Sequence, residues 1–478
     1  MKNRTIVLVF VLMAVLCGTA FSQNASDFTV DAQGVITKYS GFDTVIVIPA
    51  TIGGKKITAI GDGAFERADL TSVTIPEGVT SIGALAFRYN KLTSVTIPNS
   101  VTSIGVEAFN DNPSLASVTF SERVETIGDR AFDIRGKPSF TLAANNNVEF
   151  SSYPMFYSYI ANDRKAGTYA FFDLQSSQKD ADNYTYYETQ YGAVLTRYKG
   201  DSTRVRIPTK IGGIAVKALC KGISMYDSTF NQIDAVQIPE GITYIGKDTF
   251  KKNHLSSVTI PNGVTYLSGF NENQLTSVTI PNSVMYIGKS AFAENQLTSI
   301  TIPNSVTTIG EEAFSNNRLN SITISNSVTT IGNEAFMNNQ LASVTIPNGV
   351  TSISERVFLE NQLTSVIIPN GVITIGKEAF RNNQLTSVTI PKSIISIGDG
   401  AFNYNKLASI TIPNSVTFIG KEAFLDNPMT RVTIGGNVEV NYDSFFYDLG
   451  NFYNNSGKVA GTYVLDTSNR RGSWSRQR

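Results

Sequence analysis

The residues that could perform acid–base, nucleophilic or metal chemistry are few and poorly grouped in this chain. His254 is the only histidine, and it stands directly before a repeated leucine position where other repeats carry Gln or Lys. We expect it to be an exposed turn residue, because no convincing Ser-His-Asp triad can be assembled around such a position. No phosphate-binding loop, zinc-ligand pattern or calcium-binding loop appears. The sequence therefore predicts a protein that is not an enzyme and has no catalytic, cofactor-binding or metal-binding residues.

The charge balance and the cysteines exclude further classes of protein. Lys and Arg together number 39, as do Asp and Glu, so the formal net charge is zero. A neutral chain has no overall basic field that attracts nucleic acid or an anionic membrane, and we expect no nucleic-acid partner. The two cysteines are Cys17 and Cys220. Because Cys17 lies in a segment that we expect to be removed, no intrachain disulfide framework is predicted.

The segment 1–22 has the three regions of a secretory signal peptide. Lys2 and Arg4 precede an apolar run at residues 6–16, and small residues stand before the expected cleavage point after Ser22. An apolar run of this length is too short to span a bilayer, which takes about 20 residues. The sequence thus predicts a secreted or cell-surface protein without a transmembrane segment after signal removal. A lipoprotein anchored at Cys17 is the alternative, although the preceding residue is bulkier than such sites normally carry.

A short, fixed period dominates the second half of the chain. A leucine or methionine recurs at every twenty-second position, at Leu275, Leu297, Leu319, Leu341, Leu363, Leu385, Leu407 and Met429. Self-similarity at such a period is typical of solenoids, in which stacked units bury one another's apolar faces. Function must then be sought on the surface, because packing occupies the interior.

The unit Leu297 to Arg318 predicts what each repeat position does. Ile300 and Ile302 are two residues apart, which places them on one face of a short strand, and Pro303 ends that strand. One such strand in each unit would build a parallel sheet. Gly310 recurs where a backbone conformation or close packing disfavours a Cβ. Residues 311–314 (Glu-Glu-Ala-Phe) could form one helical turn. We therefore predict a leucine-rich repeat solenoid of α/β type, with the parallel β-sheet on its concave face and short helical turns on its convex face.

Two rows of repeated residues are interpreted as an internal ladder. The first row contains Phe314, Phe336, Phe358 and Phe380, and the second follows three positions later with Asn317, Asn339, Asn361 and Asn383. We interpret the phenylalanines as a stacked aromatic spine rather than a ligand groove. A repeated amide beside core residues is best explained by inward hydrogen bonds to adjacent rungs, which avoid unpaired burial. The alternative is an exposed amide row that binds glycan.

The outward strand positions are almost uniformly Ser and Thr, so departures from that pattern are the candidate ligand contacts. Ile367 replaces the usual Thr and Arg431 replaces the usual Ser, and Thr345 and Thr389 belong to the same face. A face of hydroxyls lacks the Trp, Tyr and Arg that dominate tight interfaces. The unit that begins at Leu255 is two residues short, which predicts a local deformation of the convex side.

Paired opening and closing segments indicate two arrays in tandem. An opening pattern near residues 35–54 resembles one at 194–213, and a closing pattern near 147–169 resembles one at 437–463. Atypical end segments around a regular array are typical of solenoid caps. We therefore predict a first capped array at 28–174, a polar linker at 175–186, a second, longer capped array at 187–466 and a basic tail at 467–478.

The repeat pattern L-x-x-V-x-I-P-x-x-V-x-x-I-G-x-x-A-F, as in residues 297–314, resembles the BspA-like leucine-rich repeats of bacterial surface proteins, notably those of treponemes and other host-associated anaerobes. The resemblance covers most of 48–134 and 207–434. Many relatives carry Cys where this chain has Asn317, and their unit is commonly one residue longer. The resemblance implies a surface or secreted module, and some members bind host matrix proteins such as fibronectin or fibrinogen. It assigns no binding residues.

These observations favour a non-enzymatic extracellular or cell-surface binding protein. It would be adhesin-like and would recognise host or microbial surface macromolecules, protein or glycan, through an extended solenoid face. The alternative is a structural scaffold or spacer of the cell envelope without a specific host ligand. A third interpretation is that the regular Ser and Thr rows order water at ice.

Overall fold

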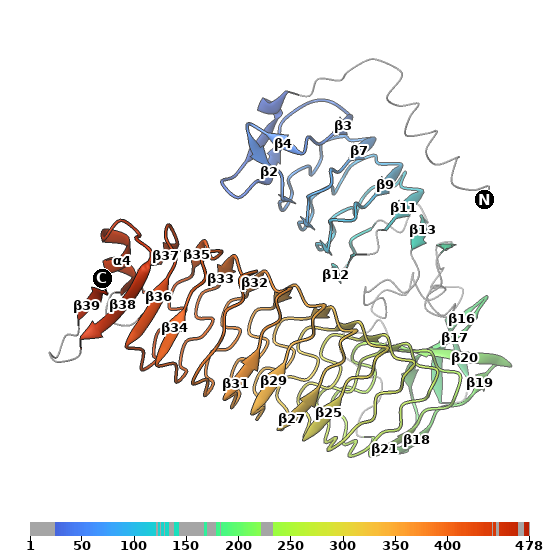
Figure 1. Cartoon of the computed structure of the whole chain (residues 1–478). Helices are drawn as coiled ribbons and strands as arrows, with labels where there is room; N and C mark the ends of the chain where they lie inside the picture. Colours follow the sequence, from blue (N-terminus) through green and yellow to red (C-terminus); the bar gives the residue numbers. More distant parts are fainter. Residues whose placement is uncertain are drawn as a thin grey trace, which may run out of the picture. The chain divides into compact units, whose positions relative to one another are not determined.

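The computed structural model describes residues 24–120, 123–124, 126–128, 130–132, 138–142, 167–169, 178–181, 183–220, 233–441, 443–445, 449–466 and 473–477. The predicted signal segment, residues 1–22, lies outside this part of the chain. The chain divides into two compact units (Figure 1). The first comprises Met1–Val148 with Ala166–Phe171, and the second comprises Glu149–Lys165 with Phe172–Arg478.

Most regular repeats contribute two short strands, whereas we predicted one. In the unit Leu297 to Arg318 the first strand is β25 (Ser299–Thr301) and the second is β26 (Thr308–Ile309). The first strand pairs in parallel with its counterpart in the next repeat through Ile300 and Ile322, and the second pairs through Ile309 and Ile331. The single-strand prediction is wrong because a two-residue strand is too short to show alternation in the sequence. The solenoid is therefore built from stacked parallel strands on two sides.

In the first unit the second strands of successive repeats form one sheet, and the first strands form shorter pairings. One sheet has the order β1 (Phe28–Val30), β2 (Val35–Tyr39), β6 (Ala59–Ile60), β8 (Ser81–Ile82), β10 (Ser103–Ile104) and β12 (Thr126–Ile127). A second sheet has the order β14 (Gly167–Tyr169), β13 (Ser139–Leu142), β11 (Ser117–Thr119) and β9 (Ser94–Thr96). The remaining pairs are β3 (Val45–Val47) with β7 (Ser72–Thr74) and β4 (Thr51–Ile52) with β5 (Lys55–Lys56).

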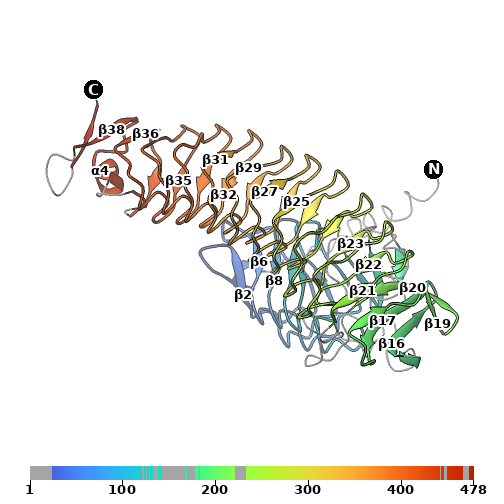
Figure 2. The ribbon, with the colours of Figure 1, turned by 90° about the horizontal axis from the view of Figure 1, so that it is seen from below.

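The second unit repeats this plan over more rungs, and Figure 2 shows its regular stacking from below. The second strands of its repeats lie in two sheets. The first sheet has the order β15 (Gln178–Ala181), β16 (Tyr184–Thr189), β17 (Gly192–Tyr198), β20 (Ile214–Leu219), β22 (Tyr244–Ile245), β23 (Tyr266–Leu267), β24 (Tyr286–Ile287), β26 and β28 (Thr330–Ile331). The second sheet has the order β30 (Ser352–Ile353), β32 (Thr374–Ile375), β33 (Ser396–Ile397), β35 (Phe418–Ile419) and β37 (Glu439–Val440). Strand β19 (Lys210–Ile211) pairs with β20. The first strands form β18 (Arg204–Arg206) with β21 (Ala235–Gln237), β25 with β27 (Ser321–Thr323), β29 (Ser343–Thr345) with β31 (Ser365–Ile367), and β34 (Ser409–Thr411) with β36 (Arg431–Ile434), β38 (Gly461–Asp466) and β39 (Ser473–Arg476).

The predicted helical turn at residues 311–314 is a different kind of turn. Glu312 has φ +57° and Asn316 has φ +53°, both in the left-handed region. The N–H groups of Glu312 and Phe314 donate to the carbonyls of Asn333 and Ala335 in the next repeat, at 2.9 Å each. In a helix these N–H groups would donate to carbonyls four residues earlier in the same repeat. Here they donate to the next repeat instead, so no helical turn forms. In the described residues the helical elements are the 3₁₀ turn η1 (Ala25–Asp27) and the helix α4 (Leu449–Asn455).

Antiparallel strands lie at the ends of the parallel ladders. Strand β1 pairs antiparallel with β2, β14 with β13, β16 with both β15 and β17, and β38 with both β36 and β39. Thus residues 178–181 of the predicted linker and residues 473–476 of the predicted basic tail form strands. The division of the chain into two capped arrays in tandem stays a prediction.

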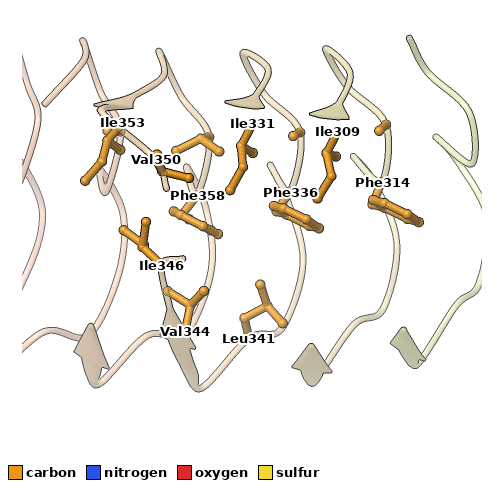
Figure 3. Close-up of a cluster of buried hydrophobic side chains, with 14 of the residues drawn as sticks. Ile309, Phe314, Ile331, Phe336, Leu341, Val344, Ile346, Val350, Ile353 and Phe358 are labelled. Carbon is orange, nitrogen blue, oxygen red and sulfur yellow. The ribbon is translucent and has the colours of Figure 1, made fainter. Parts of the chain in front are cut away.

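Apolar side chains from every repeat of the second unit form one continuous core. In the unit Leu297 to Arg318, the side chains of Leu297, Ile300, Ile302, Val306 and Ile309 are all buried. Figure 3 shows Ile309, Ile331 and Ile353 along one side of this core, with the phenylalanines between them and Leu341. Gly310 leaves no room for a side chain, since an added Cβ would lie 2.7 Å from the backbone of Gly288. Close packing therefore explains this repeated glycine.

Candidate functional site

The predicted asparagine row forms a ladder inside the second unit. The Oδ1 of Asn361 accepts the N–H of Leu341 at 3.1 Å, and its Nδ2 donates to the carbonyls of Phe336 and Phe358 at 2.9 and 3.3 Å. Asn317, Asn339 and Asn383 make the equivalent bonds. Each amide thus ties neighbouring repeats together. All four side chains are buried, so they are not available to a ligand.

The phenylalanine row lies beside this ladder. From Phe250 to Phe445, consecutive rings are stacked with centroids 5.0 to 5.7 Å apart. Phe314, Phe336, Phe358 and Phe380 are at most 1 % exposed, and Figure 3 shows three of these rings in file. Rings at this separation contribute dispersion and quadrupole attraction in addition to their buried area. This row is therefore part of the packing between repeats.

The outward residues of the first strands form an exposed hydroxyl face. In β25, β29 and β34 the central residue is buried, while the flanking Ser and Thr are exposed. Ile367 interrupts this face, because its side chain is 63 % exposed. It pairs in register with Thr345 of β29, and Thr389 is exposed on the following repeat. The structure thus brings three of the four predicted ligand-face residues onto adjacent rungs.

Arg431, the fourth predicted residue, has a different environment. It lies in β36, which pairs antiparallel with β38, and its Nη1 donates to Gln477 Oε1 at 3.0 Å. Its side chain therefore packs at the end of the ladder, next to the closing strands. It is two repeats further along the array than Thr389.

A third side of each repeat is formed by the turns around the phenylalanine, and sequence reasoning missed its features. We call it the turn side and define it in the second unit as the two residues that precede each Ala-Phe pair and the two that follow it. Here Glu378 accepts hydrogen bonds from Arg356 Nε at 2.6 Å and from Arg381 Nη1 at 2.7 Å. Burial alone would raise the pKa of Glu378, but the hydrogen bonds and charges of Arg356 and Arg381 outweigh it, and the pKa is lowered. In the sequence, the signal for this side is that residues flanking the Ala-Phe pair differ from one repeat to the next, whereas the buried positions stay uniform.

A hollow lies on the turn side of the short repeat that begins at Leu255 and of the repeats next to it. Phe270 follows Leu267 by three positions, whereas Phe314 follows Ile309 by five. The hollow has a volume of about 280 Å³, and its lining includes Lys247, Lys251, Glu272, Lys289, Glu294 and Glu312. Lys251 Nζ lies 3.1 Å from Glu272 Oε1, and Lys289 Nζ lies 2.8 Å from Glu311 Oε1. The predicted local deformation of the convex side stays a prediction.

The described residues show no arrangement for catalysis or metal binding around the single histidine. His254 Nδ1 lies 3.7 Å from Asp234 Oδ1, and both side chains are 55 % exposed. Within the described part of the chain, no group of three or more His, Cys, Asp or Glu residues is placed to hold a metal ion. Nothing in this part of the molecule points to catalytic activity.

Comparison with known proteins identifies the family. The chain matches the model of the BspA type leucine-rich repeat region (6 copies) over residues 44–160, 221–342, 266–384 and 329–453, which together cover more than two thirds of its length. The chain therefore belongs to the BspA-type leucine-rich repeat proteins. Leucine-rich repeat proteins generally serve as scaffolds for protein interaction. No curated protein matches the chain.

Several solved structures resemble the chain. A leucine-rich repeat protein from Bacteroides ovatus is 21 % identical with a TM-score of 0.37, covering 84 % of this chain and 89 % of that one. A leucine-rich cell surface protein from Faecalibacterium prausnitzii is 23 % identical with a TM-score of 0.28, covering 86 % and 93 %. A leucine-rich repeat protein from Eubacterium ventriosum is 21 % identical with a TM-score of 0.31, covering 84 % and 90 %. Among the described residues of the present chain, the helices are too short or too polar to cross a bilayer.

Proposed function

We propose that this chain is an extracellular, adhesin-like binding protein that recognises host or microbial surface macromolecules through the exposed face of its first strands. Residues 1–22 would direct its export, with cleavage after Ser22. A site on the exposed face is supported by the interior, where the Phe and Asn rows are buried between repeats and cannot contact a partner. Binding without turnover is expected.

The single observation that carries the proposal is Ile367. This side chain is 63 % exposed at the centre of a face whose neighbouring outward residues are Ser and Thr. Isolated exposed apolar residues are common on protein surfaces. Here, however, the position is occupied by Thr in most repeats, and the strand would fold equally well with it. An apolar group surrounded by hydroxyls can fill a pocket of a partner while the hydroxyls form hydrogen bonds around it.

The partner is proposed to be a protein of the extracellular matrix type. The face around Ile367 lacks exposed Trp and Tyr and is poor in charge, so affinity must come from many modest contacts along several repeats. An extended partner such as fibronectin or fibrinogen fits this requirement, because it can engage successive rungs. Binding by such a face should depend weakly on salt, since it neutralises few charges.

The test is binding of the purified chain to immobilised fibronectin, fibrinogen and laminin across a salt series. We expect saturable binding that Ile367→Thr weakens by about tenfold, the equivalent of one well-packed apolar contact. Ile395→Thr is the matched control, because Ile395 is 48 % exposed but precedes β33, a strand of the other sheet. Equal losses in both variants would contradict the proposed face. Absence of saturable binding to all three proteins would favour the alternative of an envelope scaffold.

A further inference from the structure

The repeat from Leu385 to Lys406 departs from its neighbours at three positions of the turn side. Gly400 stands where the adjacent repeats carry Glu378 and Glu422. Asn403 occupies the position directly after the phenylalanine, where the preceding repeat has Arg381. Tyr404 follows, where the preceding repeat has Asn382. A small residue, an amide and an aromatic ring are thus introduced together in one repeat.

Tyr404 has a backbone conformation that does not suit an aromatic residue. Its φ is +54°, like that of Asn316 and Asn382 at the equivalent position of other repeats. Asn tolerates the left-handed region far better than a bulky residue does. The Tyr404 side chain is nevertheless 49 % exposed, so the ring gains little from packing in return. Neither backbone preference nor burial accounts for tyrosine at this position.

Arg381 is held against the Tyr404 ring. Its guanidinium carbon lies 5.7 Å from the ring centroid, within the range of cation–π attraction. Its Nη1 donates to Glu378 Oε1 at 2.7 Å, and Arg356 Nε donates to the other oxygen of Glu378 at 2.6 Å. This chain of contacts fixes the guanidinium and compensates its charge. A ligand at the ring therefore meets an ordered but electrically balanced surface.

Two buried polar atoms, on a residue that contacts the Tyr404 ring and on the residue before Tyr404, have no hydrogen-bond partner in the described part of the chain. They are Arg381 Nε, a donor, and Asn403 Oδ1, an acceptor. The Asn403 side chain is only 2 % exposed, and the residue directly precedes Tyr404 in the chain. Buried polar groups are nearly always paired, so an unpaired donor on Arg381 and an unpaired acceptor on Asn403 require an explanation. A ligand that carries both an acceptor and a donor would supply the missing partners.

We propose that Tyr404, Arg381 and Asn403 form a binding site for a neutral pyranose ring of a glycan. One face of a pyranose consists of C–H groups, which pack against an aromatic ring. Its hydroxyls both donate and accept, so they can pair with Asn403 Oδ1 and Arg381 Nε. Because Glu378 already compensates Arg381, an anionic ligand gains no special advantage.

This site is separate from the strand face of the proposed function. Tyr404 lies on the turn side of its repeat, whereas Ile367 lies in β31 among the first strands. Binding of a sugar at Tyr404 therefore does not require protein binding at Ile367. The two proposals can succeed or fail independently.

The first unit offers a matched control residue. Tyr89 occupies the equivalent position, with φ +57° and 38 % exposure. The guanidinium carbons of Arg67 and Arg88 lie 4.3 and 4.5 Å from the centroid of its ring. The position equivalent to Asn403 is held by Arg88, whose Nη2 donates to the Tyr89 hydroxyl at 3.0 Å. Tyr89 is thus similarly exposed, but two cations already contact its ring.

The experiment is saturation-transfer NMR on the whole purified chain with the methyl pyranosides of glucose, galactose, mannose and N-acetylglucosamine. We expect saturation transfer to at least one of them. Tyr404→Asn should abolish it while leaving the melting temperature unchanged or raised, because Asn suits the left-handed backbone. Asn403→Ser, which introduces the residue found at Ser315, should weaken binding by about tenfold. Tyr89→Asn should leave binding unchanged.

Three results would overturn the proposal. The first is absence of saturation transfer to all four pyranosides with the unaltered chain. The second is retention of binding in Tyr404→Asn, or an equal loss in Tyr89→Asn. The third is loss of matrix-protein binding in Tyr404→Asn without any sugar binding, which would instead make Tyr404 a contact for a protein partner. The Ile367→Thr variant should behave like the unaltered chain with the bound pyranoside.

Discussion

The regular repeat Leu297 to Arg318 and the short repeat Leu255 to Gln274 share an interior but differ at the surface. In the short repeat Asn273 Nδ2 donates to the carbonyls of Phe250 and Phe270 at 2.8 and 3.1 Å, and its Oδ1 accepts the N–H of Leu255 at 3.1 Å. Asn317 makes the same set of bonds in the regular repeat. The Phe270 ring stacks between its neighbours at 5.0 and 5.7 Å. The ladder is therefore independent of the repeat length.

The difference in length between the two repeats lies in the turn. The carbonyl of Gly269 accepts the N–H of Phe250 at 2.7 Å, which is the role of the Ala313 carbonyl toward Phe292 in the regular repeat, at 2.8 Å. The two missing residues are thus the equivalents of Glu311 and Glu312. Gly269 spans the gap with φ +86°, and an added Cβ would lie 2.3 Å from the carbonyl oxygen of Gly246. The surface turn adapts so that the interior bonds can stay in register.

The largest expected effect on this comparison comes from Gly269→Ala. The substitution forces a left-handed alanine against the Gly246 carbonyl, and we expect a loss of about 2–4 kcal/mol in the free energy of unfolding. Gly63→Ala is the control, because Gly63 also has a positive φ, +60°, but its nearest neighbour would be the Glu66 side chain at 3.8 Å. It should lose only the backbone term, about 1–2 kcal/mol. Denaturant titration of both variants measures the difference.

Restoring the missing residues gives the complementary result. If Ser268-Gly269 is replaced by Gly-Lys-Glu-Ala, the repeat regains the length and the turn of its neighbours. We expect this variant to be at least as stable as the unaltered chain. Equal stability of Gly269→Ala and Gly63→Ala would contradict the explanation of the short turn.

The next largest effect compares the ladder asparagine of a regular repeat, Asn361, with that of the short repeat, Asn273. Asn361→Ala removes a buried amide and leaves a backbone N–H and three carbonyls without that partner, which should cost about 1–3 kcal/mol. Asn273→Ala should cost the same within error, because the bonds of Asn273 are the same despite the shorter repeat. Thermal melting of both variants tests this equality. A much smaller loss for Asn273→Ala would show that the deletion weakens the interior as well.

The smallest effect is the pH dependence of stability, because the groups concerned lie near the surface. The pKa of Glu378 is lowered by Arg356 and Arg381 despite burial. Its stabilising contribution is therefore present above the pKa of the unfolded chain and is lost as the pH falls through the lower folded value. Glu378→Gln should flatten the acid side of the stability profile.

Lys251, which faces the short repeat, should act at the opposite end of the pH range. Burial alone would lower its pKa, but the hydrogen bond to Glu272 and the charges of Asp248, Glu272 and Glu294 raise it. Its contribution is present below the unfolded pKa and is lost as the pH rises through the higher folded value. Lys251→Gln should flatten the alkaline side only. The free energy of unfolding of both variants is measured across pH. If both variants changed the same side of the stability profile, acid or alkaline, this assignment would be contradicted.

The sequence predicted the interior well because the interior repeats. Leu297, Phe314 and Asn317 recur at fixed spacing, and each position meets only its own counterparts in adjacent repeats. Periodicity therefore reports burial and pairing at once. The second strand and the turn were predicted poorly. Thr308–Ile309 is too short for an alternation, and residues 311–314 favour helix locally while their N–H groups bond to the next repeat.

The site at Tyr404 could not be derived from the sequence. Arg381 and Tyr404 belong to successive repeats, and their contact depends on how one repeat lies on the next. The unpaired state of Asn403 Oδ1 and Arg381 Nε is likewise a property of packing. Only the substitutions at 400, 403 and 404 were visible beforehand, and their meaning required the three-dimensional neighbours.

The sequence by itself determined the period, the solenoid, the buried rows and the family, because each of these follows from one unit being repeated along one axis. Tertiary structure decided what lies between the units. The second sheet, the left-handed turns and the grouping of Tyr404 with Arg381 all depend on contacts across adjacent repeats. Such contacts are set by the rotation and offset of each rung, which a residue pattern read within one unit does not contain.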